Sequence, residues 1–340
     1  MSKKLMIVGG TGFLGYYTAK LALSKGYKVG SISILDDDLI NKDLSSWFPK
    51  EIENTILDVF SASEEEIEKA LKGYDYMIYS VGPDDRETPQ APAYDYFHRR
   101  LVVECAKCFR AAERAGIKKS VCFNSYFAYF DRLYPEMELT KKHPYIRCRV
   151  EQAKILNEQK KNMEVVVMEY PYIFGVMPER MPIWKQTFLD RYANGHKSIF
   201  FPKGSTSMTS VDHIAESAMG AIEYGRDGER YPVADENQSF DFMLNTMTGA
   251  VLPKPRKIIH PAVWMCAMGG QMVANQEKKH GGEPGLNLKL VMKEIMNGDK
   301  FCIPQEKIEE VREELHIGRG GLKESIEVTM HRCYPDGTFK

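Results

Sequence analysis

The first half of the chain alternates short apolar runs with longer amphipathic stretches. An apolar run of strand length begins at residue 5 as LMIVGG, and a stretch with helical periodicity follows it. The strands predicted in this way are 5–10, 27–34, 74–82, 118–125 and 163–171. The helices predicted between them are 13–26, 61–73, 93–116 and 143–156. Strands that alternate with helices pair in parallel, so the pattern predicts an α/β protein with a Rossmann-type, doubly wound parallel sheet.

A glycine-rich turn separates the first predicted strand from the first predicted helix. Gly9, Gly12 and Gly15 follow a GxxGxxG spacing. Here the first glycine permits a tight turn, the second lets backbone amides approach a pyrophosphate, and the third lets the helix pack on its strand. The turn therefore predicts a dinucleotide site for NAD or NADP. Its expected contacts are Gly9, Thr11, Gly12, Phe13, Leu14 and Gly15.

The residue at the tip of the second predicted strand usually contacts the adenosine ribose. Register from the glycine turn places Ser33 there, and an acidic run at Asp36, Asp37 and Asp38 follows. Carboxylates repel a phosphate on the ribose, which slightly favours NAD over NADP. Alternatively, these aspartates cap the short helix that follows them.

The helix predicted at 143–156 places a tyrosine and a cation on one face. Tyr145 and Arg149 are four residues apart, so their side chains are neighbours. A free tyrosine, with a pKa of about 10, is a poor acid–base group at neutral pH, and a nearby cation lowers that pKa. Arg149 has no acidic residue three or four positions away, whereas Arg147 has Glu151 and is the better surface ion-pair candidate. We therefore interpret Tyr145 as a proton donor and acceptor and Arg149 as part of the same site.

After Pro171 the alternation breaks, and proline, methionine and aromatic residues become frequent. We predict a dinucleotide-binding domain at 1–170 and a mixed α/β substrate-binding lobe at 171–340, partly interleaved with the first. An apolar stretch at 261–274 is too short to span a bilayer. We expect it to form a buried or pocket-lining helix, with contact to a membrane surface as the less favoured alternative. Three methionines share one face of that helix, and we expect them to pack in a core rather than against a greasy ligand: Met265, Met268 and Met272.

Composition narrows the partners. The chain has 340 residues and a net charge of −1, so it carries no basic field that would hold nucleic acid. The N-terminus lacks the apolar stretch of a signal peptide, and we expect a cytoplasmic protein with reduced thiols. Cys105 and Cys108 form a CxxC spacing without further ligands nearby, so we expect no metal site. The expected partners are a small-molecule substrate and a second copy of the chain in a homodimer.

Six ordered motifs carry a family resemblance over roughly residues 4–235. They are GGTGFLG at 9–15, LDV at 57–59, YSVGP at 79–83, FNSYFAYF at 123–130, YIRCR at 145–149 and PYIFG at 171–175. In this order they resemble the extended short-chain dehydrogenase/reductase family, which includes NAD-dependent epimerases and dehydratases. The resemblance implies an NAD(P)-dependent enzyme with a C-terminal substrate lobe.

The resemblance also assigns roles to matching residues. It implies that Ser125 hydrogen-bonds the substrate oxygen and that Tyr145 exchanges its phenolic proton. It further implies that Asp58 and Val59 bracket the adenine ring and that Val81 and Gly82 line the nicotinamide ribose. Pro171, Tyr172 and Ile173 would pack near the nicotinamide.

Three positions depart from the family pattern. Arg149 stands where the family has lysine, Leu101 where many members have asparagine, and Glu169 where an arginine is common. Arginine keeps the charge beside Tyr145 but not the compact ammonium, so it changes cofactor geometry more than acid–base chemistry. The chain thus resembles a divergent member of the family.

Three functions are compatible with these features. The first is an oxidoreductase that interconverts an alcohol and a ketone on an apolar, for example steroid-like, small molecule. The second is a nucleotide-sugar epimerase or dehydratase. The third is a dinucleotide-binding sensor or scaffold that does not turn over. The second needs cations for a diphosphate, and the later lobe offers Arg180, Lys185, Arg191, Lys197 and Lys203.

Overall fold

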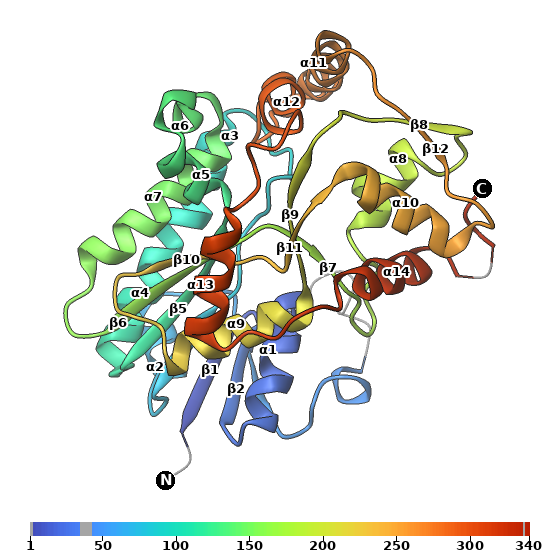
Figure 1. Cartoon of the computed structure of the whole chain (residues 1–340). Coiled ribbons are helices and arrows are strands. Elements are labelled where there is room, and N and C mark those ends of the chain that lie inside the picture. The colour runs from blue at the N-terminus through green and yellow to red at the C-terminus, as the bar shows by residue number, and fades with distance from the viewer. Residues whose placement is uncertain (1–2, 35–42, 336) are drawn as a thin grey trace.

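The computed structural model describes residues 3–34, 43–335 and 337–340 (Figure 1). Within these residues, seven strands form one fully parallel sheet in the order β10–β6–β5–β4–β1–β2–β3. Its strands are β1 Lys4–Val8, β2 Lys28–Ser33, β3 Glu53–Ile56, β4 Tyr76–Tyr79, β5 Lys119–Ser125, β6 Glu164–Tyr170 and β10 Arg230–Pro232. The predicted Rossmann-type fold class is confirmed, and all five predicted strands are present.

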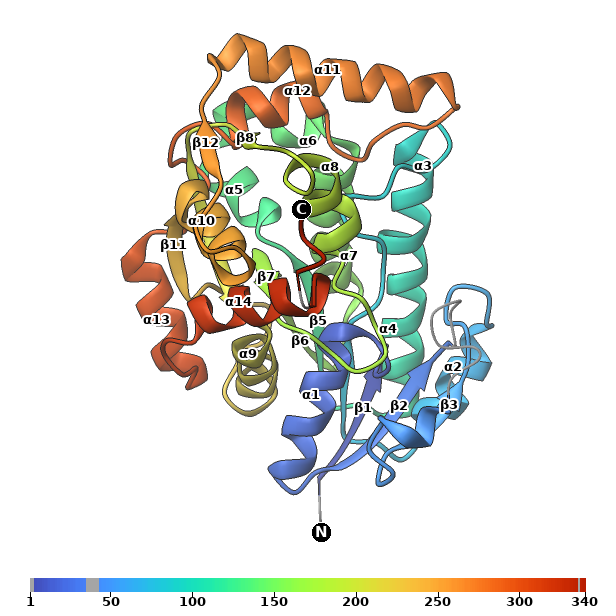
Figure 2. The same ribbon diagram turned by 90° about the vertical axis from the view of Figure 1, so that its right-hand side faces the viewer.

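Helices cover both faces of this sheet. α1 (Phe13–Ser24) and α9 (Val211–Glu223) pack together on one face, and α2 (Glu64–Leu71) and α4 (Glu104–Ala115) lie on the other (Figure 2). α7 (Pro144–Gln159) packs beside α4. The sequence accounts for these elements locally. For example, α2 begins at a capping box in which the Ser63 hydroxyl accepts from the Glu66 amide and the Glu66 carboxylate accepts from the Ser63 amide.

The helix predicted at 93–116 is one continuous run of three segments. It consists of α3 (Ala93–Phe97), a π-helical segment η2 (His98–Val103) and α4. Gly116 ends it with a φ of 84°, a left-handed conformation that glycine adopts without strain. Leu101, one of the family departures, lies fully buried in η2.

Two strands of the sheet escaped the sequence prediction. β3 has the sequence ENTI, in which polar residues interrupt the apolar run, and it forms an edge of the sheet. β10 comes from residues 230–232, about sixty positions after β6, and pairs with β6 in parallel. Its distance along the chain gave no signal that it would join the same sheet.

The departure at Glu169 is compensated by a different arginine. Glu169 is completely buried near the carboxyl end of β6, and its two carboxylate oxygens accept from Nη1 and Nη2 of Arg132 at 2.6 and 2.7 Å. Arg132 belongs to α5 (Phe127–Leu133), which follows β5. The pair therefore ties α5 to the adjacent strand.

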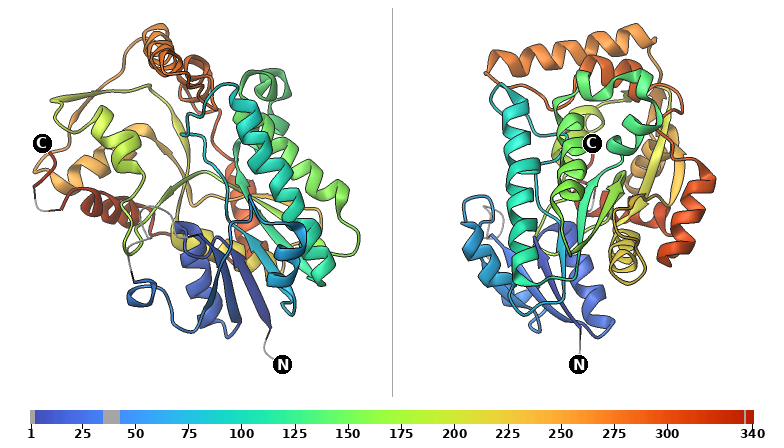
Figure 3. Two further views of the ribbon diagram at one scale, coloured as in Figure 1. Left: turned by 180° about the vertical axis from the view of Figure 1, so that it is seen from behind. Right: turned by 90° about the vertical axis from the view of Figure 1, so that its left-hand side faces the viewer.

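The C-terminal half forms a second layer beyond the carboxyl ends of the strands and also returns to the sheet (Figure 3). Its smaller sheets have the orders β11–β9–β7 and β12–β8. Their strands are β7 Tyr172–Phe174, β8 Ser198–Phe200, β9 Ser205–Ser210, β11 Glu236–Ser239 and β12 Lys257–Ile259. The helices of this half besides α9 are η4 Lys185–Leu189, α8 Asp190–Tyr192, α10 Phe240–Val251, α11 Val263–Lys279, α12 Leu288–Leu290, η5 Val291–Ile295, α13 Gln305–Leu315 and α14 Leu322–Cys333. Shorter elements of the first half are η1 Leu44–Ser46, η3 Pro135–Met137 and α6 Leu139–Lys142.

The prediction for the apolar stretch at 261–274 was wrong in placing its three methionines in a core. It does form a helix, α11, but Met265, Met268 and Met272 are 49%, 56% and 69% exposed and belong to no core. α11 instead buries its small residues Ala267 and Gly270. A Cβ at Gly270 would lie 2.4 Å from the Leu288 carbonyl, so the helix approaches α12 through the residues that occupy least space. Its large apolar side chains consequently face outward.

Among the described residues, no helix is long and apolar enough to cross a membrane.

Candidate active site

The glycine turn after β1 has the close contacts that its spacing predicts. Gly9 has a φ of 92°, and its carbonyl accepts from the Gly12 amide at 3.0 Å. A Cβ at Gly15 would lie only 2.1 Å from the Gly9 carbonyl oxygen. Only glycine at position 15 lets α1 approach β1 this closely.

The N-terminus of α1 has no side-chain cap and faces a cavity. Gly12 is the N-cap and supplies no side-chain acceptor. Among the described residues, no group accepts from the amides of Phe13 and Leu14, and both residues line the cavity together with Gly12. These free amides and the helix dipole favour an anion at this point.

The structure places Ser33 at the end of β2, as the register predicts, but directs its hydroxyl inward. The Ser33 hydroxyl accepts from the Thr11 amide at 3.1 Å and lies 2.9 Å from the Ser31 hydroxyl, and Ser33 is only 4% exposed. Ser33 therefore holds the glycine turn in place. Asp36, Asp37 and Asp38 lie outside the described residues.

The LDV motif does not reach the cavity either. The Asp58 carboxylate accepts from the Phe60 amide and the Ser61 hydroxyl, both at 2.9 Å, so it stabilises its own turn. Val59 is buried in the core. Their assignment to the adenine ring remains a prediction.

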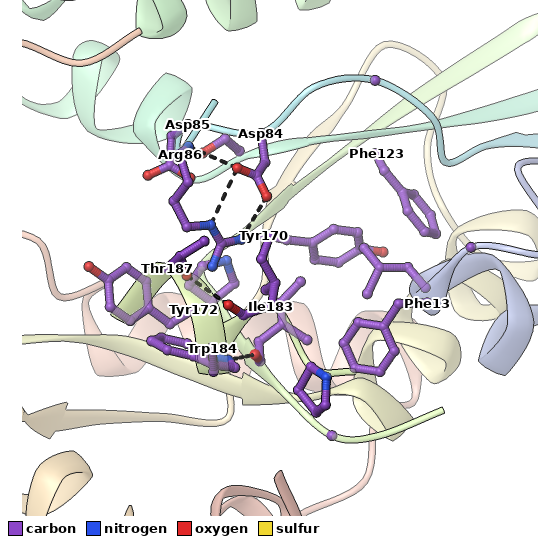
Figure 4. Close-up of a pocket in the computed structure, with 18 of the residues that line it drawn as sticks. Phe13, Asp84, Asp85, Arg86, Phe123, Tyr170, Tyr172, Ile183, Trp184 and Thr187 are labelled. Carbon is purple, nitrogen blue, oxygen red and sulfur yellow. Dashed lines mark hydrogen bonds and ion pairs between the residues drawn. The ribbon is translucent and has the colours of Figure 1, made fainter. Parts of the chain in front are cut away.

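The main cavity has a volume of about 800 Å³ and lies at the carboxyl ends of β1, β4, β5 and β6. The residues around it come from both halves of the chain (Figure 4). Ligands of doubly wound sheets bind at this edge. Beyond the glycine turn, the predicted site residues on its wall are Val81, Gly82, Ser125, Tyr145, Arg149, Pro171, Tyr172 and Ile173. Of the five cations considered for a diphosphate, only Arg180 lines this cavity.

Tyr145 and Arg149 meet inside the cavity wall. The Arg149 Nε donates to the Tyr145 hydroxyl at 2.9 Å, and the two residues are only 8% and 3% exposed, respectively. The predicted surface pair is also present, because the Arg147 Nε contacts a Glu151 carboxylate oxygen at 2.8 Å. The same helix thus carries two arginines in different surroundings. Arg147 is exposed and pairs with a carboxylate, and Arg149 is buried and hydrogen-bonds a phenol.

The rest of the Arg149 guanidinium is held by the protein. Nη1 donates to the Phe123 carbonyl at 3.3 Å and to the Gln152 amide oxygen at 3.0 Å, and Nη2 donates to the Pro83 carbonyl at 3.2 Å. The Asn124 side chain donates to the Arg149 carbonyl and to the same Gln152 oxygen. Neither residue was predicted as part of the site. Asn124 reaches Arg149 only through the packing of α7 on β5, whereas Gln152 lies three residues after Arg149 on the same helix.

Burial keeps the Tyr145 phenol protonated, so the net lowering of its pKa that the neighbouring cation predicts is not found. Burial raises the pKa of Tyr145 to about 12, although the Arg149 guanidinium acts to lower it, and the nearby Asp85 carboxylate raises it further. A phenol in this state holds a proton that it can donate, and an additional positive charge in the cavity would favour its phenolate.

Ser125 ends β5 and lines the same cavity as Tyr145. Its amide donates to the Asn124 side chain at 2.6 Å, and its hydroxyl accepts from the Phe127 amide at 3.4 Å. The bond to Phe127 uses the hydroxyl only as an acceptor. Its proton therefore stays free to be donated to a ligand oxygen.

A charged segment that was not predicted follows β4 on the cavity wall. The Arg86 Nη2 lies 2.9 Å from an Asp84 carboxylate oxygen, and the Arg86 guanidinium lies 5.9 Å from the centre of the Trp184 ring (Figure 4). Burial raises the pKa of the Asp84 carboxyl, but Arg86 outweighs burial and holds the pKa below its ordinary value. Burial also raises the pKa of the Asp85 carboxyl, which stays above its ordinary value. The signal in the sequence was position alone, since these residues directly follow the YSVGP motif.

Known structures share this fold along nearly the whole chain. The structure named gox2253 matches with a TM-score of 0.71 at 16% identity, over 100% of both chains. PA4631, a nucleoside-diphosphate-sugar epimerase from Pseudomonas aeruginosa, matches with a TM-score of 0.66 at 17% identity, over 100% of both chains. UDP-glucuronic acid 4-epimerase from Bacillus cereus, in complex with NAD, matches with a TM-score of 0.64 at 12% identity, over 97% of this chain and 98% of that one.

No protein-family model and no curated protein sequence matches this chain. At identities of 12–17% the structural matches show that the fold is shared.

Proposed function

We propose that this chain is an NAD(P)-dependent enzyme of the extended short-chain dehydrogenase/reductase family that acts on a nucleotide sugar as an epimerase or dehydratase. The observation that carries the proposal is the buried hydrogen bond between Arg149 and Tyr145 in the cavity onto which the uncapped α1 opens. Dinucleotide binding and proton transfer need these two features within one cavity.

The residues present fit a dinucleotide. Gly12, Phe13 and Leu14 would hold its pyrophosphate, because the amides of Phe13 and Leu14 are free at the helix N-terminus that Gly12 begins. Val81 and Gly82 line the cavity between that point and Tyr145. NAD is favoured over NADP, since the Bacillus cereus epimerase of the same fold was solved with NAD.

The cofactor, when bound, supplies and takes back a hydride at its nicotinamide. The protein's part is the proton. Tyr145 donates its phenolic proton to a substrate oxygen when a carbonyl is reduced and takes it back when a hydroxyl is oxidised. Arg149 stabilises the phenolate that remains, and the Ser125 hydroxyl is placed to donate to the same oxygen.

The comparisons support a nucleotide sugar better than the steroid-like substrate favoured from the sequence. Two of the three proteins named above are epimerases of nucleotide-linked sugars. In this chain the support is Arg180 on the cavity wall, a cation for a diphosphate.

An apolar alcohol or ketone is the second candidate substrate, because part of the cavity wall is aromatic. Tyr126, Phe127, Tyr172, Trp184 and Phe188 line it. A dinucleotide-binding sensor without turnover is the third reading, and its signature would be cofactor binding with no hydride transfer.

The first experiment is a fluorescence titration of the purified protein with NADH and with NADPH. Nucleoside-diphosphate sugars and apolar secondary alcohols are then tested as substrates, with products followed by NMR. Tyr145→Phe should bind the cofactor as the wild type does and lose turnover at least about a hundredfold, the usual contribution of general acid–base catalysis. Tyr224→Phe is the matched control, since Tyr224 is 49% exposed and does not line the cavity.

Unchanged turnover in Tyr145→Phe would rule out the proposed proton transfer. Turnover of apolar alcohols alone would transfer the proposal to the second candidate substrate. Binding without turnover on either class would leave the sensor reading.

A further inference from the structure

α11 presents an apolar stripe to solvent. Trp264, Met268 and Met272 repeat every four residues and so share one face, on which they are 62%, 56% and 69% exposed. Figures 1 and 2 show α11 lying along one end of the molecule. We call Trp264, Met268 and Met272 the α11 stripe.

A further exposed apolar side chain belongs to the strand pair that precedes α11. β8 and β12 are parallel, and Phe200 at the end of β8 lies opposite Ile259 at the end of β12. β12 leads through Pro261 directly into α11, so Phe200 lies near the start of the helix, and it is 64% exposed. Met265, 49% exposed, shares the face of Met268 and Met272, and Val263, 42% exposed, lies in the first turn of the helix. Several large apolar side chains at one end of a molecule mark an interaction surface rather than chance exposure.

Lysines lie at both ends of this apolar surface. Lys278 and Lys279 are in the last turn of α11. At the other end are Lys197, Lys254 and Lys257, which precede or belong to β8 and β12. All five are exposed, and none of them forms an ion pair with another described residue. The nearest acidic residue in sequence, Glu277, already contacts Arg191.

The segment that contains β12 and α11 is basic although the whole chain is not. Residues 252–300 contain eight lysines and arginines and four aspartates and glutamates, in a chain with a net charge of −1. The occupant of the surface should therefore combine an apolar interior with negative charge at its rim.

We propose that α11 docks on the surface of a lipid bilayer that contains anionic headgroups. A helix that lies flat at such an interface inserts one apolar face to a shallow depth and keeps lysines at headgroup level. Tryptophan is the side chain that best suits that depth. Contact with a membrane surface, the less favoured alternative from the sequence, is thus preferred here, because the methionines expected in a core face solvent.

Charge argues against a second copy of the chain as the occupant. A symmetric pair that buried the α11 stripe would oppose either Lys278 and Lys279 to themselves or one lysine cluster to the other. Both arrangements bring positive charge against positive charge, which disfavours association. A bilayer with negative headgroups has the opposite effect.

The test is cosedimentation of the full-length protein with vesicles. We expect binding to vesicles of equimolar phosphatidylcholine and phosphatidylglycerol and much weaker binding to phosphatidylcholine alone. Lys278→Gln with Lys279→Gln should weaken the partition coefficient about 25-fold, at about fivefold for each lysine. Replacement of Trp264, Met268 and Met272 by serine should abolish binding, and exposure makes these changes harmless to the fold.

Tryptophan emission gives a second readout. Of the three tryptophans, Trp184 is 6% exposed and Trp47 is half-buried, so a blue shift on adding anionic vesicles should disappear in Trp264→Phe. The matched apolar control replaces Val103 and Val328, both 47% exposed, by serine.

Three results would overturn the proposal. The first is no binding to anionic vesicles, and the second is binding that the serine variant retains. The third is concentration-dependent dimerisation that the serine variant abolishes in lipid-free buffer, because it would assign the surface to a second copy of the chain. Cofactor binding, measured in parallel, reports on the fold of each variant and is independent of lipid binding.

Discussion

Arg149→Lys tests how the site is built around a guanidinium. In the wild type the guanidinium donates four hydrogen bonds, to the Tyr145 hydroxyl, the Gln152 amide oxygen and the carbonyls of Phe123 and Pro83, at 2.9 to 3.3 Å. An ammonium has three protons on one atom, so it cannot reach acceptors spread around a planar fork. At least one buried acceptor therefore loses its partner.

The size of the effect follows from those contacts. A buried acceptor left without a donor costs about 1–3 kcal/mol, and one to two such acceptors give a destabilisation of about 3 kcal/mol. For a chain of 340 residues, the entropy of unfolding converts 3 kcal/mol into a fall in Tm of about 4 °C. Because the family that the sequence resembles has lysine at this position, the resemblance favours retained or improved cofactor binding in Arg149→Lys. The four contacts favour weaker binding instead, because Phe123 lies on the cavity wall and Pro83 beside it.

The assays are thermal unfolding by circular dichroism and titration with NADH. Arg147→Lys is the control, since Arg147 lies on the same helix, is 50% exposed, pairs with Glu151 and lies over the Tyr94 ring, where a lysine keeps the positive charge. It should change the Tm by less than about 1 °C, because exposed i,i+4 pairs contribute about 0.3–0.5 kcal/mol. If Arg149→Lys has the same Tm as the wild type and binds NADH equally well, the guanidinium contacts do not stabilise the site, and the proposed role of Arg149 is refuted.

Three further substitutions test the surroundings of the site. Burial lowers the pKa of His143 in the folded protein from 6.5 to about 4. As the pH falls from 6.5 to 4, the unfolded chain therefore binds a proton that the folded chain does not, and the free energy of unfolding falls by about 3 kcal/mol. In His143→Asn this part of the pH dependence should be absent from urea titrations. Arg132→Met leaves the fully buried Glu169 without its partner, and we expect a loss of about 3 kcal/mol by urea unfolding. Gly15→Ala forces a Cβ to 2.1 Å from the Gly9 carbonyl, so NADH binding should disappear and stability should fall by about 3 kcal/mol.

Each of these has a distinguishing control. An unchanged acid dependence in His143→Asn would mean that other groups cause it. Glu169→Gln added to Arg132→Met should recover part of the loss, and no recovery would show that the cost is packing rather than unpaired charge. Gly269→Ala meets no atom within 4 Å of its new Cβ and should be neutral, in contrast to Gly15→Ala.

The local part of the site could be predicted from the sequence. The glycine turn and the pairing of Tyr145 with Arg149 depend on spacing within one turn or one helix, and the structure shows both. The contacts of Asn124 and Asp84 could not be predicted, because they depend on which strands become neighbours and on where each strand ends.

The same limit explains the error at α11. Periodicity predicts which residues share a face, and Met268 and Met272 do share one. It does not say which face turns inward, and here close approach through Ala267 and Gly270 outweighs the size of the methionines. Backbone proximity, and not side-chain hydrophobicity, decided the orientation.

The position of β10 affects how the chain folds as it is synthesised. β6 ends at Tyr170, and the strand that pairs with its outer side begins at Arg230. At about 5–20 residues per second, the ribosome needs on the order of 3–12 s to add those residues. Throughout that interval β6 is an edge strand with free amides and carbonyls, open to pairing with another nascent chain. Protection by a chaperone during synthesis is therefore most valuable in this window, and a fragment that stops at residue 170 carries the exposed edge permanently.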